Sequence, residues 1–127
     1  MRIVLVTGTR DDNYFEDGDV QFALKEIKPD LVINGACPTG VDRMMLDQAG
    51  FMGVPTITMP AMWKEFGKRA GFIRNSDMAR MFKDLQHYGH ELICLAFPKG
   101  TSWSGTRNCM SEAEKYGWKV INLGDQP

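Results

Sequence analysis

A run of cations and glycines in the middle of the chain contains the groups best suited to binding an anion. The run extends from Gly67 to Met78 and includes Lys68, Arg74 and Asn75. Its glycines allow a backbone to approach a ligand closely, and it should begin a helix, whose free N–H groups favour negative charge. The run therefore predicts part of an anion site, with Lys68, Arg74 and Asn75 as contacting side chains.

Two further glycine-bearing turns lie elsewhere, at residues 35–42 and 98–106. In the second turn, a helix that begins at Gly105 and Thr106 would offer backbone N–H groups and a hydroxyl to phosphate oxygens. In the first turn, Asp42 could accept a hydrogen bond from a ribose hydroxyl, as acids do in dinucleotide-binding folds. It is equally consistent with an ordinary acid in the first turn of a helix. Together the turns predict a site for a phosphate-bearing small molecule.

A third turn follows the first apolar run of the chain. It contains Gly8, Thr9 and Arg10, and Arg10 could join Arg74 in bidentate contacts with phosphate. Gly8 is equally consistent with a tight turn that has no ligand. Trp63 could stack on a nucleobase or pack against its own domain. The predicted ligand-binding residues are Gly8, Thr9, Arg10, Gly35, Gly40, Asp42, Trp63, Lys68, Arg74, Asn75, Gly105 and Thr106.

Apolar runs and helical periodicities alternate along the chain and must position these turns. Strands are predicted at residues 3–6, 31–33, 56–59, 92–97 and 119–123, and helices at 19–27, 41–52, 70–85 and 105–116, with 60–66 irregular. Because the strands are apolar throughout, both of their faces should be buried, as in a parallel sheet. The predicted fold is α/β: a single Rossmann-like, doubly wound domain over residues 1–127, with a mainly parallel five-stranded sheet and helices on both faces.

The three turns share one end of this predicted sheet. Each follows the carboxyl end of a strand, whereas the turns at the opposite end, residues 28–30, 53–55 and 116–118, contain only connector residues. Ligands of open parallel sheets bind beyond the carboxyl ends of the strands, where the strand order reverses. The asymmetry between the two ends therefore predicts where the ligand lies.

Composition limits the classes of function. The 127 residues carry a formal net charge of −1, so a nucleic-acid-binding surface would have to be local. The densest basic segment, residues 64–80, has five cations and is equally consistent with a solvated helix face. The charge balance therefore weighs against a nucleic-acid partner.

Cysteines and histidines indicate neither a metal site nor a disulfide framework. The chain has three cysteines, and they form no CxxC motif. His87 and His90 have no acidic or cysteine partners in a recognisable metal pattern and are interpreted as surface residues. No apolar stretch reaches the length of a membrane span. We expect a cytoplasmic protein with no cofactor, no metal and no membrane partner.

Three motifs together resemble a known superfamily. They are Gly35-Ala-Cys-Pro-Thr-Gly40-Val-Asp42, then Trp63 with Gly67-Lys68-x-Ala70-Gly71-x-x-Arg74-Asn75-x-x-Met78, then Phe97-Pro98 with Gly105-Thr106. In this order, and over almost the whole chain, they resemble the YspA-like branch of the SLOG superfamily, which is common in bacteria and phages. The resemblance implies a Rossmann-like fold, a nucleotide or nucleotide-derived ligand, and a homo-oligomer. SLOG domains act as sensors or as enzymes.

The chain departs from one enzymatic group of that superfamily. LOG proteins hydrolyse the N-glycosidic bond of nucleoside monophosphates and have a PGGxGTxxE motif, whose glutamate is catalytic. Here the position three residues after Thr106 is Cys109, and Glu112 follows one helical turn later. Asp42 and Glu112 are the acids that we nominate for general acid–base chemistry.

Three functions follow from these observations. The first is the binding of a nucleotide or nucleotide-derived, phosphate-bearing small molecule by a sensor or sequestering protein. The second is an N-glycosidase, or phosphoribohydrolase, that acts on nucleoside monophosphates through Asp42 or Glu112. The third is a nucleic-acid-binding module that uses the cations between residues 64 and 80, with an affinity that falls steeply with salt.

Overall fold

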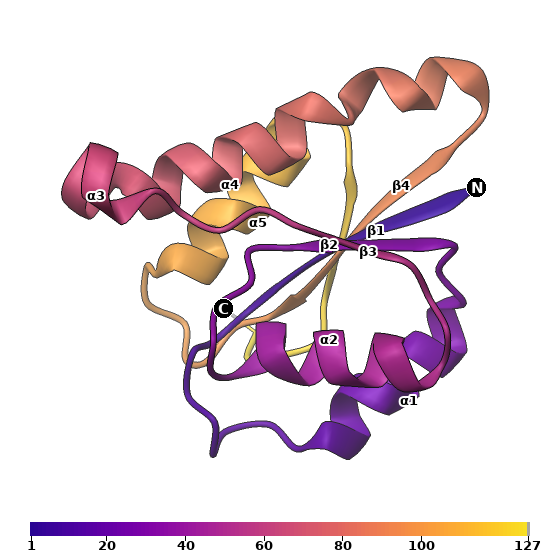
Figure 1. Ribbon diagram of the computed structural model, residues 1–127, viewed down its shortest axis with the longest axis horizontal. Helices are drawn as coiled ribbons and strands as arrows, with labels where there is room; N and C mark the ends of the chain where they lie inside the picture. Colours follow the sequence, from indigo (N-terminus) through magenta and orange to yellow (C-terminus); the bar gives the residue numbers. More distant parts are fainter. Residues whose placement is uncertain (127) are drawn as a thin grey trace.

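Aliphatic and β-branched runs form a five-stranded sheet in the computed structural model, which describes residues 1–126 (Figure 1). All neighbouring strands pair in parallel, in the order β3-β2-β1-β4-β5. The strands are β1 (Arg2–Gly8), β2 (Leu31–Asn34), β3 (Thr56–Thr58), β4 (Glu91–Phe97) and β5 (Lys119–Asn122). The predicted parallel sheet is confirmed.

Helices cover both faces of the sheet. α1 and α2 pack together on one face, and α4 and α5 pack together on the other (Figure 1). Their bounds are α1 (Asp17–Ile27), α2 (Val41–Phe51), α4 (Ala70–Met81) and α5 (Gly105–Lys115), with the short α3 (Trp63–Phe66) and the 3₁₀ helices η1 (Gly67–Arg69) and η2 (Lys83–Tyr88) between β3 and β4. The arrangement confirms the predicted doubly wound α/β fold.

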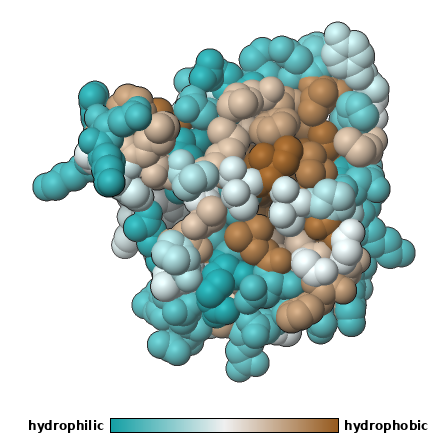
Figure 2. All heavy atoms as spheres, viewed as in Figure 1, coloured by the Kyte–Doolittle hydropathy of each residue, from teal (hydrophilic) through white to brown (hydrophobic). Residues whose placement is uncertain are grey.

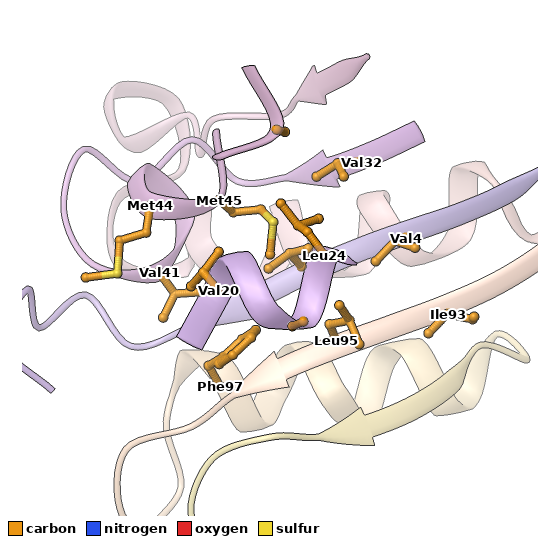
Figure 3. Close-up of a cluster of buried hydrophobic side chains, with 13 residues drawn as sticks. Val4, Val20, Leu24, Val32, Val41, Met44, Met45, Ile93, Leu95 and Phe97 are labelled. Carbon is orange, nitrogen blue, oxygen red and sulfur yellow. The ribbon is translucent and has the colours of Figure 1, made fainter. Parts of the chain in front are cut away.

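Each face of the sheet has its own apolar core, because successive side chains of a strand point to opposite faces. In β1, Val4 and Val6 belong to the core beneath α1 and α2, which Figure 3 shows. Ile3 and Leu5 belong to the core beneath α4 and α5. All four residues are fully buried. The unbroken apolar run of this strand is therefore explained by burial on both faces.

Several predicted boundaries differ from the structure. β1 continues to Gly8, which was expected in the turn after the strand, and two later segments differ more. Residues 60–66 were expected to be irregular, but Trp63–Phe66 form one turn of helix. The helix predicted over residues 70–85 ends at Met81, and the chain continues as the 3₁₀ helix η2. Phe82 and Leu85 both pack against the core on this side of the sheet. The three-residue repeat of a 3₁₀ helix puts them on the same side, which the α-helical repeat does less well.

The strand order reverses between β1 and β4 at the centre of the sheet. From β1 the chain passes to β2 and β3 on one side, and from β4 it passes to β5 on the other. The loops after β1 and β4 consequently separate above this switch point, which is where open parallel sheets bind ligands. Within residues 1–126, no helix combines the length and the apolar composition needed to span a membrane.

Candidate functional site

A cavity of about 400 Å³ opens at the carboxyl ends of the strands, at the switch point. Its wall includes every predicted ligand-binding residue except Gly35 and Gly40. These residues come from the end of β1 and the loop after it, from the start of α2, from α3, η1 and α4, and from the start of α5. The structure therefore brings ten of the twelve predicted residues together.

The N-terminus of α5 presents unpaired donors to this cavity. Ser104 caps the helix, since its hydroxyl accepts a hydrogen bond from the Arg107 N–H at 3.2 Å. The N–H groups of Gly105 and Thr106 have no partner among residues 1–126. Thr106 is only 6% exposed, and its hydroxyl is likewise without a partner in the described chain. Such a helix start attracts an anion through both its N–H groups and its dipole.

Two cations at the cavity are free to meet a ligand. The Arg10 guanidinium lies 5.3 Å from the centre of the Trp63 ring, in cation–π geometry. The Arg10 carbonyl accepts a hydrogen bond from the Thr39 hydroxyl at 2.8 Å, which fixes the backbone at this position. The Arg10 guanidinium forms no ion pair with the described residues. Lys68 is exposed and also lacks an ion pair within residues 1–126. By contrast, Lys99 is bound to Asp11 at 2.7 Å.

Arg74 lines the cavity, but two of its three guanidinium nitrogens donate hydrogen bonds to protein groups. One terminal nitrogen donates to the Gly35 carbonyl at 2.8 Å and to the Met59 carbonyl at 3.3 Å, and Nε donates to Asn75 at 2.9 Å. The side chain therefore ties the ends of β2 and β3 to α4. Its other terminal nitrogen is the part that remains for a ligand.

Asn75 also lines the cavity without offering free donors to it. It is 4% exposed, and its amide nitrogen donates to the Gly105 carbonyl at 3.1 Å and to Asn108 at 2.9 Å. These bonds hold the first turn of α5 against α4. Asn75 therefore positions the helix N-terminus that carries the free donors.

Gly35 and Gly40 lie outside the cavity wall, contrary to prediction. A Cβ at Gly35 would collide with the Arg74 guanidinium, and a Cβ at Gly40 would collide with the Thr9 carbonyl oxygen. Gly40 also has φ of 74°, in the left-handed region. Both glycines therefore allow protein groups to approach each other, and they shape the site without contacting its contents.

Asp42 lies in the cavity wall but is 7% exposed. One carboxylate oxygen accepts a hydrogen bond from the Cys37 N–H at 3.2 Å. Burial raises the pKa of Asp42 to about 6, although the Cys37 N–H and the charge of Arg74 act in the opposite direction. A carboxyl group with a pKa near 6 can both accept and release a proton near neutral pH.

Glu112 is not part of the cavity wall, so its nomination as an acid–base group at this site is not supported. It lies two turns into α5, and the helix leads away from the cavity. At about 1.5 Å per residue, Glu112 is roughly 9 Å along the axis from Thr106. Of the two nominated acids, only Asp42 reaches the cavity.

The prediction missed six wall residues: Thr7, Cys37, Gly71, Phe72, Lys99 and Ser104. Each is adjacent or close in sequence to a predicted residue, so reading the turns as segments would have included them. Phe72 and Trp63 are both 47% exposed, and together they give the cavity an aromatic side. The signal available in the sequence was the position of Gly71 and Phe72 inside the run that already supplied Lys68 and Arg74.

The basic segment at residues 64–80 does not form one continuous cationic surface. Arg80 pairs with Asp77 at 2.7 Å, and Arg74 is bound to backbone carbonyls. Lys64, Lys68 and Arg69 remain exposed on the short helices. This geometry weighs further against a nucleic-acid interface.

Comparisons with known proteins identify one phage relative. No family model matches the chain. The chain is 46% identical over 80 residues to the Gene 61 protein of Mycobacterium phage D29. The match covers 63% of this chain but only 56% of the phage protein, and the name of that protein states no activity.

Proposed function

We propose that this protein binds a nucleotide or nucleotide-derived, phosphate-bearing small molecule in the cavity at the carboxyl ends of the strands, as a sensor or sequestering protein of the YspA-like SLOG branch. The observation that carries the proposal is the start of α5, where two backbone N–H groups and the Thr106 hydroxyl line the cavity and are unpaired within residues 1–126. Unpaired donors at a helix start that line a cavity are satisfied by water or by a ligand, and an anion suits them best.

Phosphate is the group that suits this helix start. The N–H groups of Gly105 and Thr106 point in the direction favoured by the helix dipole, and the Thr106 hydroxyl adds a third donor. Arg10 and Lys68 lie in the same cavity wall, supply positive charge and form no ion pair with a carboxylate of the described chain. Because these groups of the cavity wall are hydrogen-bond donors and cations, the wall favours an anion over a neutral ligand.

The aromatic side of the cavity supports a nucleobase as the second part of the ligand. Trp63 and Phe72 are half exposed and belong to the wall that Lys68 also lines. Stacking of a base on an aromatic ring or on a guanidinium plane contributes about 1–3 kcal/mol. Asp42 lies in the same cavity wall and is the acceptor for a sugar hydroxyl.

The proposal is tested by isothermal titration calorimetry of the purified protein against nucleoside mono-, di- and cyclic phosphates, with the matching nucleosides as controls. We expect at least one nucleotide to bind and its nucleoside to bind much more weakly. If a folded sample, verified by circular dichroism, binds no member of the panel, the proposal is rejected.

Hydrolysis of the N-glycosidic bond is a second candidate, because Asp42 combines a place in the cavity wall with a pKa of about 6. Free base released from nucleoside monophosphates should be measured by chromatography. We expect Asp42→Asn to abolish the release, whereas Glu112→Gln should retain it, since Glu112 is outside the wall. Nucleotide binding without any base release would reject the hydrolase and leave the binding proposal intact.

A further inference from the structure

β3 is a short edge strand that carries no charged side chain. All three of its residues are exposed, and Ile57 is 38% exposed. The surrounding segment, residues 51–63, contains no charged residue. The opposite edge differs, because β5 begins with the exposed cation Lys119. Charged side chains, lysine above all, normally prevent an edge strand from pairing with another chain.

The outward backbone groups of β3 can be assigned from its bonds to β2. Pro55 accepts from the Val32 N–H at 3.0 Å, and the Met59 N–H donates to Asn34 at 2.8 Å, so both residues direct their backbone toward β2. Direction alternates along a strand. Thr56 and Thr58 therefore direct their N–H and C=O groups away from the sheet, and these groups have no partner within residues 1–126.

We propose that β3 pairs antiparallel with β3 of a second copy of this chain, so that the two sheets join across a twofold axis at Ile57. In this register, Thr56 lies opposite Thr58 of the second copy, and Thr58 lies opposite its Thr56. Each of these two pairs exchanges both of its backbone hydrogen bonds, while the two Ile57 residues form the non-hydrogen-bonded pair between them. The outward groups of both strands are then fully satisfied.

Self-pairing fits this edge better than pairing with an unrelated strand. A twofold axis brings like residues near each other, so an interface without charges avoids like-charge repulsion. Cross-strand threonine pairs are favourable. Pro60 limits the pairing after the strand, because its position is an outward one by the same alternation and proline has no N–H to extend a ladder.

The surface beside β3 is apolar enough to close around such a pair. Figure 2, viewed from the side of β3 as in Figure 1, shows hydrophobic side chains across the middle of this face and hydrophilic ones around its rim. Exposed apolar residues precede the strand at Met52 (38%) and follow it at Met62 (53%) and Phe66 (41%). An antiparallel pair brings the segment before one strand to the segment after the other.

A shallow hollow lies next to the strand on the α3 side. It measures about 190 Å³ and is lined mainly by apolar residues, including Met59, Met62 and Phe66. This hollow is of the size of a large side chain, and the second copy would present Phe51 and Met52, from the end of its α2, at this end of the strand. An apolar patch with a polar rim is typical of a protein interface.

Cysteine cross-linking tests the register directly. In a Cys37→Ser background, which removes the only thiol that is not buried among the described residues, Ile57→Cys should form a disulfide-linked dimer under mild oxidation. Residues of a non-hydrogen-bonded pair have Cα atoms about 4.5 Å apart, within the range of a disulfide. Thr56→Cys and Thr58→Cys are matched controls, because each lies diagonal to its own copy, at about 7–8 Å, which is too far.

Light scattering after size exclusion gives an independent readout. We expect the unmodified chain to be dimeric and Thr58→Pro to be monomeric, while Thr58→Val remains dimeric. The proline removes an outward N–H and leaves the bonds to β2 in place. A monomer at 100 μM (about the concentration of a crystallisation or titration sample), a dimer that persists in Thr58→Pro with native-like circular dichroism, or equal cross-linking by all three cysteine variants would each overturn the proposal.

Discussion

Replacing Gly105 with proline would remove a single proposed phosphate donor while preserving the fold. Gly105 is the first residue of α5, a position where proline is favoured because its missing N–H has no helical partner. The residue before a proline must be extended, and Ser104 already has φ of −155° and ψ of 172°. A Cβ at Gly105 would meet no heavy atom within 4 Å. The variant should therefore fold normally.

The magnitude follows from the kind of bond that is lost. A hydrogen bond to a charged group contributes about 1.5–3 kcal/mol. Loss of the Gly105 N–H should therefore weaken nucleotide binding roughly 10- to 150-fold. The free energy of unfolding should not fall, because proline at a compatible position restricts the unfolded chain and stabilises a protein by about 0.4–1 kcal/mol.

The assay is isothermal titration of the best nucleotide in the panel, with thermal unfolding of the same samples without ligand. Gly105→Ala is the matched control, since it adds a side chain at the same open position but retains the N–H. We expect the alanine variant to bind within a few-fold of the unmodified protein. If Gly105→Pro binds as tightly as Gly105→Ala, the start of α5 does not hold the phosphate and the reasoning fails.

Two further predictions concern Asp42 and Trp63. Since burial raises the pKa of Asp42 from 3.8 to about 6, the folded state binds its proton more tightly than the unfolded state, and this group lowers the free energy of unfolding as pH rises from about 4 through 6. The free energy of unfolding of Asp42→Asn, relative to that of the unmodified chain, should therefore increase by up to about 3 kcal/mol between pH 4 and pH 8. Urea unfolding measures both free energies, and a difference between them that is constant with pH contradicts this prediction. Trp63→Leu should weaken the binding of adenosine 5′-monophosphate roughly 5- to 150-fold but should change the binding of ribose 5-phosphate little. If titrations show equal losses of affinity for the two ligands, base stacking on Trp63 is excluded.

The sequence was sufficient for the parts of this molecule that depend on local pattern. Unbroken apolar runs such as Ile3 to Val6 indicated strands buried on both faces, and their alternation with helices predicted a parallel sheet. The three glycine-bearing turns could be placed at one end of that sheet because parallel strands all end on the same side. That reasoning identified most of the cavity wall.

Contacts between residues distant in the chain decided which side chains of the site reach the cavity and which bond to the protein. Arg74 was expected to hold phosphate, but carbonyl groups at Gly35 and Met59 occupy much of its guanidinium. Glu112 shares a helix with Thr106, yet the direction of α5 takes it away from the cavity. A residue type shows which bonds a side chain can make, whereas packing between strands and helices selects the partner. The chemistry available to this protein was therefore visible in its sequence, and the assignment of each group to ligand or to scaffold required the folded chain.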